Sequence, residues 1–212
     1  MSGFVLPDRP LTVAAIGAHP DDIEIGCGGT LLLLAERPGT DIRSLILTGT
    51  PDREREAVAA AHAFGVATGP RFRRLTDARL PSQWDDVKDE LHAFREEIGP
   101  PDVVFAPRHD DAHQDHALIG ALVRTVWRGP VILHYEIPKW DGDLGRPNVY
   151  VPLSDELATR KVALLNECFP SQHARDWWDD EFFLSLMRLR GAESQNRYAE
   201  AFTSTKITLG VS

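Results

Sequence analysis

Two short polar clusters in the sequence carry imidazoles and carboxylates at spacings that suit a metal site. The first is the run Ala18-His19-Pro20-Asp21-Asp22, and the second, spanning 108–116, contains His109, Asp110, Asp111, His113, Asp115 and His116. An imidazole and two carboxylates within four residues are costly to bury without a partner, and a metal ion is the simplest one. Two histidines and one carboxylate, with positions left for water, are a recurrent ligand set for catalytic metals. The sequence therefore predicts a metal site built from both clusters.

Both clusters follow apolar stretches that are typical of buried strands. Residues 11–18 contain the first stretch, and residues 102–107 contain the second. Open α/β sheets bind ligands at the carboxyl ends of their strands, so we expect the two clusters to meet at one edge of a sheet. For either cluster alone, capping of the next helix is an alternative role. Two clusters at equivalent points of one sheet favour the shared site.

Strand and helix patterns alternate through the first 135 residues. The expected strands are 11–18, 41–48, 71–75, 102–107, 131–135 and 149–153, and the expected helices are 26–37, 53–64, 84–98, 118–126, 155–167 and 177–189. Asp52, Ser82 and Ser154 are the expected N-caps. This alternation indicates βαβ units and a mostly parallel sheet that is covered on both faces. We therefore expect a single domain over residues 1–212, a Rossmann-like three-layer α/β sandwich.

Composition restricts the partners and the compartment. The chain has 23 Lys and Arg against 32 Asp and Glu, a formal net charge of −9 and no basic run, which argues against nucleic acid and anionic membranes as partners. The longest apolar run, 31–35, is too short to span a membrane, and residues 1–10 lack the apolar region of a signal peptide. Cys27 and Cys168 form no CxxC zinc motif. We expect a cytoplasmic protein, and the sequence leaves open whether it forms a homo-oligomer.

The run from Ala18 to Leu31, AHPDDIEIGCGGTL, resembles the signature of the PIG-L/LmbE-like N-acetylglucosaminyl deacetylases. The second signature of that family is similar to His113-Gln114-Asp115-His116. Weaker similarities lie at Arg53 with Glu56, Asp77 with Leu80, Tyr135-Glu136, Ser171-Gln172, Arg190-Gly191 and Ala199-Glu200-Ala201-Phe202. The sequence departs from the family pattern at Ile23, where many members have Glu, and at Gln114, where many have Pro.

The resemblance implies a role for each polar residue of the two motifs. It implies His19, Asp22 and His116 as metal ligands. It implies Asp21 as the general base and His113 as the group that faces the oxyanion or the leaving amine, with Asp115 orienting His113. It also suggests that Arg53 contacts substrate hydroxyls or an anionic group, the alternative being a solvated charge at a helix end.

These residue types suit the hydrolysis of an amide. A divalent metal polarises the carbonyl and lowers the pKa of bound water to roughly 7. Adjacent carboxylates can divide the work, Asp22 binding the ion and Asp21 taking a proton. A protonated His113 would stabilise the oxyanion, and such donors are typically worth about 3–4 kcal/mol. We expect zinc, while Fe(II) or another divalent ion also suits this ligand set.

The expected activity is zinc-dependent N-deacetylation of an N-acetylglucosamine-type sugar conjugate, a small molecule, with release of acetate and a free amine. A metal-dependent amidase for a non-sugar amide and a non-catalytic sugar- or nucleotide-binding module are the alternatives. The glycines at 26–29 lack the GxGxxG spacing directly after a strand, which argues against dinucleotide binding. Trp140, Trp177 and Trp178 either stack on a sugar ring or pack the core, and substrate choice is expected to depend on 139–148 and on 177–178.

Overall fold

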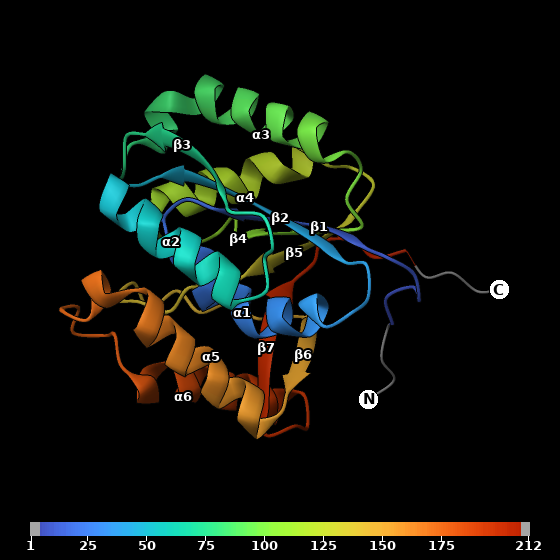
Figure 1. Cartoon of the computed structure of the whole chain (residues 1–212), viewed down its shortest axis with the longest axis vertical. Coiled ribbons are helices and arrows are strands. Elements are labelled where there is room, and N and C mark those ends of the chain that lie inside the picture. Colours follow the sequence, from blue (N-terminus) through green and yellow to red (C-terminus); the bar gives the residue numbers. More distant parts are fainter. Residues whose placement is uncertain (1–4, 209–212) are drawn as a thin grey trace.

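A seven-stranded sheet forms the middle layer in the computed structural model, which describes residues 5–208 (Figure 1). Its strand order is β3-β2-β1-β4-β5-β7-β6. The strands are β1 (Thr12–Gly17), β2 (Asp41–Thr48), β3 (Arg71–Leu75), β4 (Val103–Pro107), β5 (Val131–Tyr135), β6 (Val149–Leu153) and β7 (Tyr198–Thr203). Strands β1 to β5 pair in parallel, whereas β7 is antiparallel to both β5 and β6. The expected mostly parallel sheet is confirmed.

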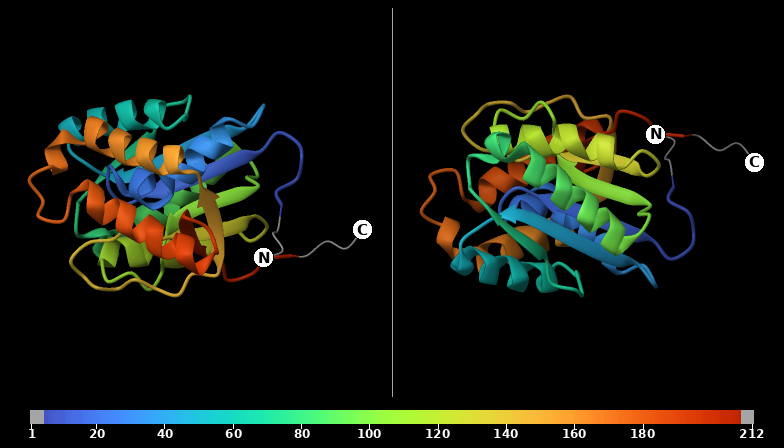
Figure 2. Two further views of the ribbon diagram at one scale, coloured as in Figure 1. Left: turned by 90° about the horizontal axis from the view of Figure 1, so that it is seen from below. Right: turned by 90° about the horizontal axis from the view of Figure 1, so that it is seen from above.

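Helices cover both faces of the sheet. The helices α1 (Asp22–Ala35), α2 (Pro51–Ala63), α5 (Asp155–Cys168) and α6 (Asp180–Glu193) share one apolar cluster, and α3 (Trp84–Ile98) and α4 (Gln114–Val126) share the other. Short 3₁₀ turns, η1 (Leu80–Gln83) and η2 (Pro170–Gln172), precede α3 and follow α5. Figure 2 shows α5 and α6 over the sheet from below, and α3 and α4 over it from above. The α/β sandwich predicted from the alternating pattern is therefore present.

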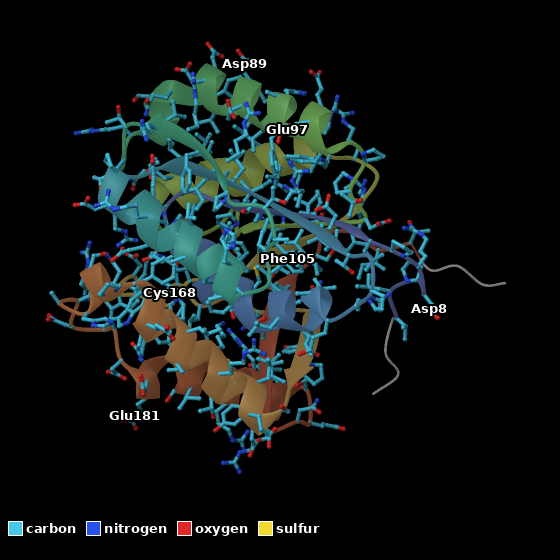
Figure 3. The ribbon with its side chains drawn as sticks, in the orientation of Figure 1. Asp8, Asp89, Glu97, Phe105, Cys168 and Glu181 are labelled. Atoms are coloured by element: carbon cyan, nitrogen blue, oxygen red, sulfur yellow. The ribbon has the colours of Figure 1, made fainter. Side chains whose placement is uncertain are left out.

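The two cores arise from the period-two pattern of the buried strands. In β1, Val13 and Ala15 face one helix layer while Ala14 and Ile16 face the other. In Figure 3, Phe105 of β4 lies inside the molecule, whereas the labelled acidic side chains of α3 and α6 lie at its surface. None of the helices within residues 5–208 has the length and apolar character that would let it cross a bilayer.

Two expectations, about the starts of α1 and α2, are wrong. Helix α1 begins at Asp22, so the glycines at 26–29 lie within it and do not lead it. They permit close packing, because a Cβ at Gly28 would come within 2.6 Å of the Phe64 ring. Thr50, not Asp52, caps α2, and its hydroxyl accepts the backbone N–H of Arg53 at 3.4 Å.

The starts of α3, α5 and α6 give two corrections and one confirmation. Residues 80–83 form a 3₁₀ turn, so α3 starts at Trp84 and Ser82 does not cap it. Ser154 caps α5 as predicted, since its hydroxyl accepts the N–H of Leu157 at 3.2 Å. Helix α6 starts three residues later than expected, at Asp180, with Asp179 as its cap.

Strand β7 is absent from the sequence-based expectation, and it stabilises a break in α1. The backbone of α1 leaves helical geometry at Cys27, where φ is −144° and ψ is 15°. Glu200 of β7 accepts the freed N–H groups of Gly29 and Thr30, at 2.8 and 2.6 Å. The ammonium of Lys161 donates to Ile25 O and to Glu200, both at 2.6 Å. A buried ion pair therefore supplies partners on both sides of the break.

Candidate active site

The two polar clusters meet in one cleft at the carboxyl ends of β1 and β4, which are adjacent parallel strands. The cleft has a volume of about 560 Å³. Its lining residues come from six connections, five that follow strands β1 to β5 and one between α5 and α6: His19, Pro20, Asp21, Asp22, Ile25, Thr48, Gly49, Thr50, Arg53, Leu75, Asp77, His113, His116, Ile137, Lys139, Trp140, Gln172, Arg175 and Trp177. The expectation that the clusters share an edge of the sheet is confirmed.

Three side-chain atoms converge at the base of the cleft. His19 Nδ1 lies 3.5 Å from Asp22 Oδ2 and 3.2 Å from His116 Nε2, and the latter two atoms are 3.3 Å apart. A tetrahedral ion with ligand bonds of about 2.0–2.1 Å separates its ligand atoms by roughly 3.3–3.4 Å. The triangle therefore has the dimensions of one face of such a tetrahedron, and these residues fit a divalent metal.

Carboxylates face the opposite nitrogens of both imidazoles. His19 Nε2 lies 3.0 Å from Asp77 Oδ1 and 3.5 Å from Asp115 Oδ2, while His116 Nδ1 lies 3.2 Å from Asp111 Oδ2. Such carboxylates hold the hydrogen on the far ring nitrogen and leave the near one free to bind a metal. Asp111 and Asp77 were not among the predicted site residues, and their only signals were a place in the second polar cluster and a weak family similarity.

The same carboxylates, together with Asp22, raise the pKa values of both imidazoles. Burial opposes protonation of His19, but Asp22, Asp115 and Asp77 outweigh it and raise the pKa of His19 to about 12. Burial is likewise outweighed at His116, where Asp22 and Asp111 raise the pKa to about 9. The base of the cleft therefore carries a field that favours positive charge.

Two other groupings of side chains around His19 also bring possible ligand atoms together. Ligand atoms of His19, His113 and His116 lie within 4.8 Å of one another, as do those of His19, Asp77 and Asp115. The second grouping uses the face of His19 that lies away from Asp22. The set with Asp22 brings three ligand atoms to within 3.5 Å of one another, a spacing that matches a tetrahedral ion.

Asp21 has an unusual backbone and does not cap the helix that it precedes. Its φ is 111° and its ψ is −25°, and its side chain makes no capping hydrogen bond. Left-handed backbone at a residue other than glycine costs of order 1–3 kcal/mol and occurs mostly where a side chain must be aimed. The Asp21 carboxylate forms an ion pair with the guanidinium of Arg53 at 2.9 Å. Burial raises the pKa of Asp21 to about 6, with Arg53 opposing and Asp22 adding to the rise.

His113 occupies the N-cap position of α4. Its Nδ1 accepts the backbone N–H of Asp115 at 3.3 Å, and its own backbone N–H donates to Asp111 at 2.8 Å. Burial and the nearby rings of His116 and His19 lower the pKa of His113, which differs from the expected protonated imidazole. A neutral ring whose Nδ1 accepts carries its hydrogen on Nε2, so His113 still offers a donor.

Asp115 does not act on His113 in the expected way. Its carboxylate is fully buried, accepts the N–H of Leu80 at 3.0 Å and faces His19. The contact with His113 runs through the Asp115 backbone, because α4 starts at Gln114 and the side chain projects from its first turn toward β1 and η1. The Asp115 carboxylate therefore lies beside His19, whereas its backbone N–H donates to His113.

Arg53 is not a solvated charge at a helix end. Its side chain is 18 % exposed, contacts Asp21 and donates to the carbonyl of Pro20 and, at 3.3 Å, to Ser171 Oγ. Glu56 accepts both the N–H and the hydroxyl of Ser171. These bonds tie the start of α2 to η2 and place the guanidinium in the cleft wall beside Asp21.

The three tryptophans singled out in the sequence lie in two different environments. Trp140 and Trp177 line the cleft. Trp178 is buried, and its indole donates to Asn166 at 3.0 Å, which is a packing role.

The sequence and the fold match those of known deacetylases. The family model for PIG-L, GlcNAc-PI de-N-acetylase, matches residues 14–127. The uncharacterised deacetylase YaiS of Escherichia coli K12 is 32 % identical, and the match covers 73 % of this chain and 89 % of YaiS. The chain therefore belongs to the PIG-L/LmbE-like deacetylases, and the family expected from the two motifs is confirmed.

Two solved structures extend the similarity across nearly the whole chain. The N,N′-diacetylchitobiose deacetylase of Pyrococcus horikoshii superposes with a TM-score of 0.72 at 25 % identity, covering 92 % of this chain and 83 % of its own. The conserved protein TT1542 of Thermus thermophilus superposes with a TM-score of 0.73 at 26 % identity, covering 95 % of this chain and 97 % of its own.

Proposed function

We propose that this deacetylase is metal-dependent and removes the N-acetyl group from an N-acetylglucosamine-type sugar conjugate, releasing acetate and a free amine. The observation that carries the proposal is the triangle of His19, Asp22 and His116, with sides of 3.2–3.5 Å, beside a buried Asp21. The family description, GlcNAc-PI de-N-acetylase, and the activity named for the P. horikoshii enzyme support an amino-sugar substrate.

His19, Asp22 and His116 would hold the metal. The two imidazoles keep the pKa of Asp22 well below its usual range despite burial, so this residue is a carboxylate at neutral pH. Zinc is the first candidate, and Fe(II) also accepts two imidazoles and a carboxylate. When bound, a divalent cation supplies a Lewis acid that polarises the amide carbonyl and makes a coordinated water more acidic.

Asp21 is the proton carrier in this proposal. A pKa of about 6 leaves the carboxylate free to accept a proton at neutral pH and able to return it. Asp21 takes one proton from the water whose oxygen adds to the carbonyl carbon. When the C–N bond breaks, the same proton passes to the departing nitrogen, so the products are acetate and a free amine. Arg53 holds the Asp21 carboxylate in place throughout.

His113 stabilises the charge that develops on the carbonyl oxygen. Its Nε2–H is the donor, since Nδ1 is engaged by the Asp115 backbone. A prealigned donor of this kind is typically worth about 3–4 kcal/mol. The ring needs no charge for this role, which agrees with its lowered pKa.

An assay of released amine tests the proposal. The protein is incubated with a panel of N-acetylglucosamine conjugates and, separately, with non-sugar acetamides, and the primary amine is measured with fluorescamine. Turnover of the sugar conjugates alone supports the proposal. Turnover of the non-sugar acetamides alone would indicate the amidase, and binding without turnover would indicate a sugar-binding module.

A further inference from the structure

The loop that follows β5 contacts the loop between β4 and α4, which carries part of the second polar cluster. We call residues 139–145, which lie between β5 and β6, the cleft loop. The carboxylate of Asp143 in the cleft loop accepts the backbone N–H of Ala112 at 2.8 Å. The ammonium of Lys139, at the start of the cleft loop, donates to the carboxylate of Asp111 at 3.0 Å. The position of the cleft loop is therefore linked to that of the β4–α4 loop.

Asp111 binds three different groups with its two carboxylate oxygens. Oδ1 accepts the backbone N–H of His113 at 2.8 Å and the ammonium of Lys139 at 3.0 Å. Oδ2 lies 3.2 Å from Nδ1 of His116, which is one of the proposed metal ligands. The terminal torsion of an aspartate has a broad minimum, so partners on both oxygens are needed to fix the plane of the carboxylate. Lys139 and the His113 N–H therefore keep Oδ2 directed at the imidazole of His116.

Burial makes Asp111 the strongest partner of the Lys139 ammonium. The side chains of Lys139 and Asp111 are only 9 % and 3 % exposed, and a lysine is rarely buried to this extent unless it is paired. Two carboxylates of the cleft loop also lie near the ammonium, Asp141 at 3.4 Å and Asp143 at 3.8 Å, but their side chains are 40 % and 17 % exposed. An ion pair is stronger where water is excluded, so the contact with Asp111 dominates.

We propose that Lys139 is a positioning residue, which couples the cleft loop to the metal ligand His116 through Asp111. The inference rests on the proposed metal site and assigns a role to a cation that the proposed mechanism does not use. Coupling between two sites is reciprocal. The contacts of the cleft loop therefore strengthen metal binding by the same factor by which bound metal stabilises the loop in this position.

Zinc affinity tests the first half of the coupling. Zinc is titrated into the metal-free protein in competition with a chromogenic chelator, and His116→Ala gives the signal of zinc bound elsewhere. Lys139→Met keeps the length of the side chain but removes its charge. It should bind zinc about 3- to 10-fold more weakly, less than the 10- to 100-fold loss typical of removing an orienting carboxylate itself. Lys139→Arg should restore most of the affinity, because a guanidinium can still donate to Asp111. Lys88→Met, which removes an ammonium of α3 that donates to Thr125, is the matched control and should bind zinc like the unaltered protein.

A double variant separates this role from a role within the cleft loop alone. If Lys139 acts through Asp111, Lys139→Met should change zinc affinity by less than about twofold when Asp111→Ala has already removed the linking carboxylate. If Lys139 acts only by pairing with Asp141 and Asp143, the loss of zinc affinity should be the same in both backgrounds, and the inference is then wrong. A raised KM with unchanged zinc affinity in Lys139→Met would also overturn it, since Lys139 would then act on the substrate directly.

Hydrogen exchange tests the reciprocal half of the coupling. The backbone N–H groups of Ala112 and Gly145 donate to Asp143 and Glu136, so their exchange reports whether the contacts of the cleft loop are formed. Zinc should slow this exchange in the unaltered protein by about 3- to 10-fold, the factor that Lys139→Met costs in zinc affinity. In Lys139→Met, zinc should leave the exchange unchanged. Exchange that zinc does not slow in the unaltered protein contradicts the coupling.

The binding and exchange measurements use zinc alone, so they separate this inference from the proposed reaction. If no N-acetylglucosamine conjugate is turned over but Lys139→Met still weakens zinc binding through Asp111, the proposed reaction fails and the coupling stands. If the conjugates are turned over but the unaltered protein and Lys139→Met bind zinc equally, the coupling fails and the reaction stands. An unaltered protein that binds neither zinc nor Fe(II) would refute both, because both require the metal site.

Discussion

Replacing Glu200 tests whether strand β7 holds the broken helix α1 together. The carboxylate accepts four hydrogen bonds, from Gly29 N, Thr30 N, Thr30 Oγ1 and Lys161 Nζ, and both members of the ion pair are at least 96 % buried. Removing one partner of a buried pair typically costs about 3–5 kcal/mol. Glu200→Gln should therefore lower the free energy of unfolding by about that amount, measured by urea denaturation with linear extrapolation.

A double variant separates the ion pair from the cap. Replacing a buried pair by apolar residues is often neutral or stabilising, so Lys161→Met with Glu200→Leu should recover stability if the charges matter only to each other. The geometry predicts otherwise, because the N–H groups of Gly29 and Thr30 would lose their acceptor. Two unsatisfied buried donors should keep the double variant roughly 2–6 kcal/mol less stable than the unaltered protein.

The experiment also measures the zinc affinity of Glu200→Gln and, as a control, the stability of a variant that loses a surface ion pair. The segment of α1 before the break carries Asp22, so we expect Glu200→Gln also to weaken zinc binding in competition with a chelator. Arg55→Gln, which removes an exposed pair with Asp52, should change stability by less than about 1 kcal/mol. A double variant as stable as the unaltered protein would refute the capping role of β7.

Three further predictions concern the site itself. Dialysis against a chelator should abolish deacetylation, and zinc or Fe(II) should restore it; activity in metal-free protein would contradict the proposed mechanism. Asp21→Asn should retain metal but lose at least about 100-fold in kcat. In the unaltered protein, kcat/KM should fall as the pH is lowered through about 6, because protonation of Asp21 removes the base; a flat profile from pH 5 to 8 would exclude that role. His116→Ala should lose metal, whereas Asp111→Asn should weaken metal affinity about 10- to 100-fold, as losing a carboxylate that orients a ligand does; equal affinity in Asp111→Asn and the unaltered protein would argue against that contact.

The sequence by itself determined the layered α/β architecture and the edge of the sheet at which chemistry can occur. Buried strands appear as apolar runs, and the residues that follow a run must lie where that strand ends. The meeting of His19, Asp21 and Asp22 with His113 and His116 follows from this local rule once β1 and β4 are neighbours. Helix starts were less accurate where glycines or a 3₁₀ turn obscured the cap, as at 26–29 and 80–83.

Only the tertiary structure decided which polar groups are partners. Asp115 faces His19 and not His113, and Arg53 binds Asp21. These contacts depend on where each helix starts and on which of its sides faces the sheet. The sequence pattern does not predict strand β7, because Glu200 interrupts its apolar run. The groups that form hydrogen bonds with this buried carboxylate lie 39 to 171 residues away in the chain. Local sequence patterns report which side chains are buried, whereas satisfying a buried charge requires donors that only the folded chain brings together.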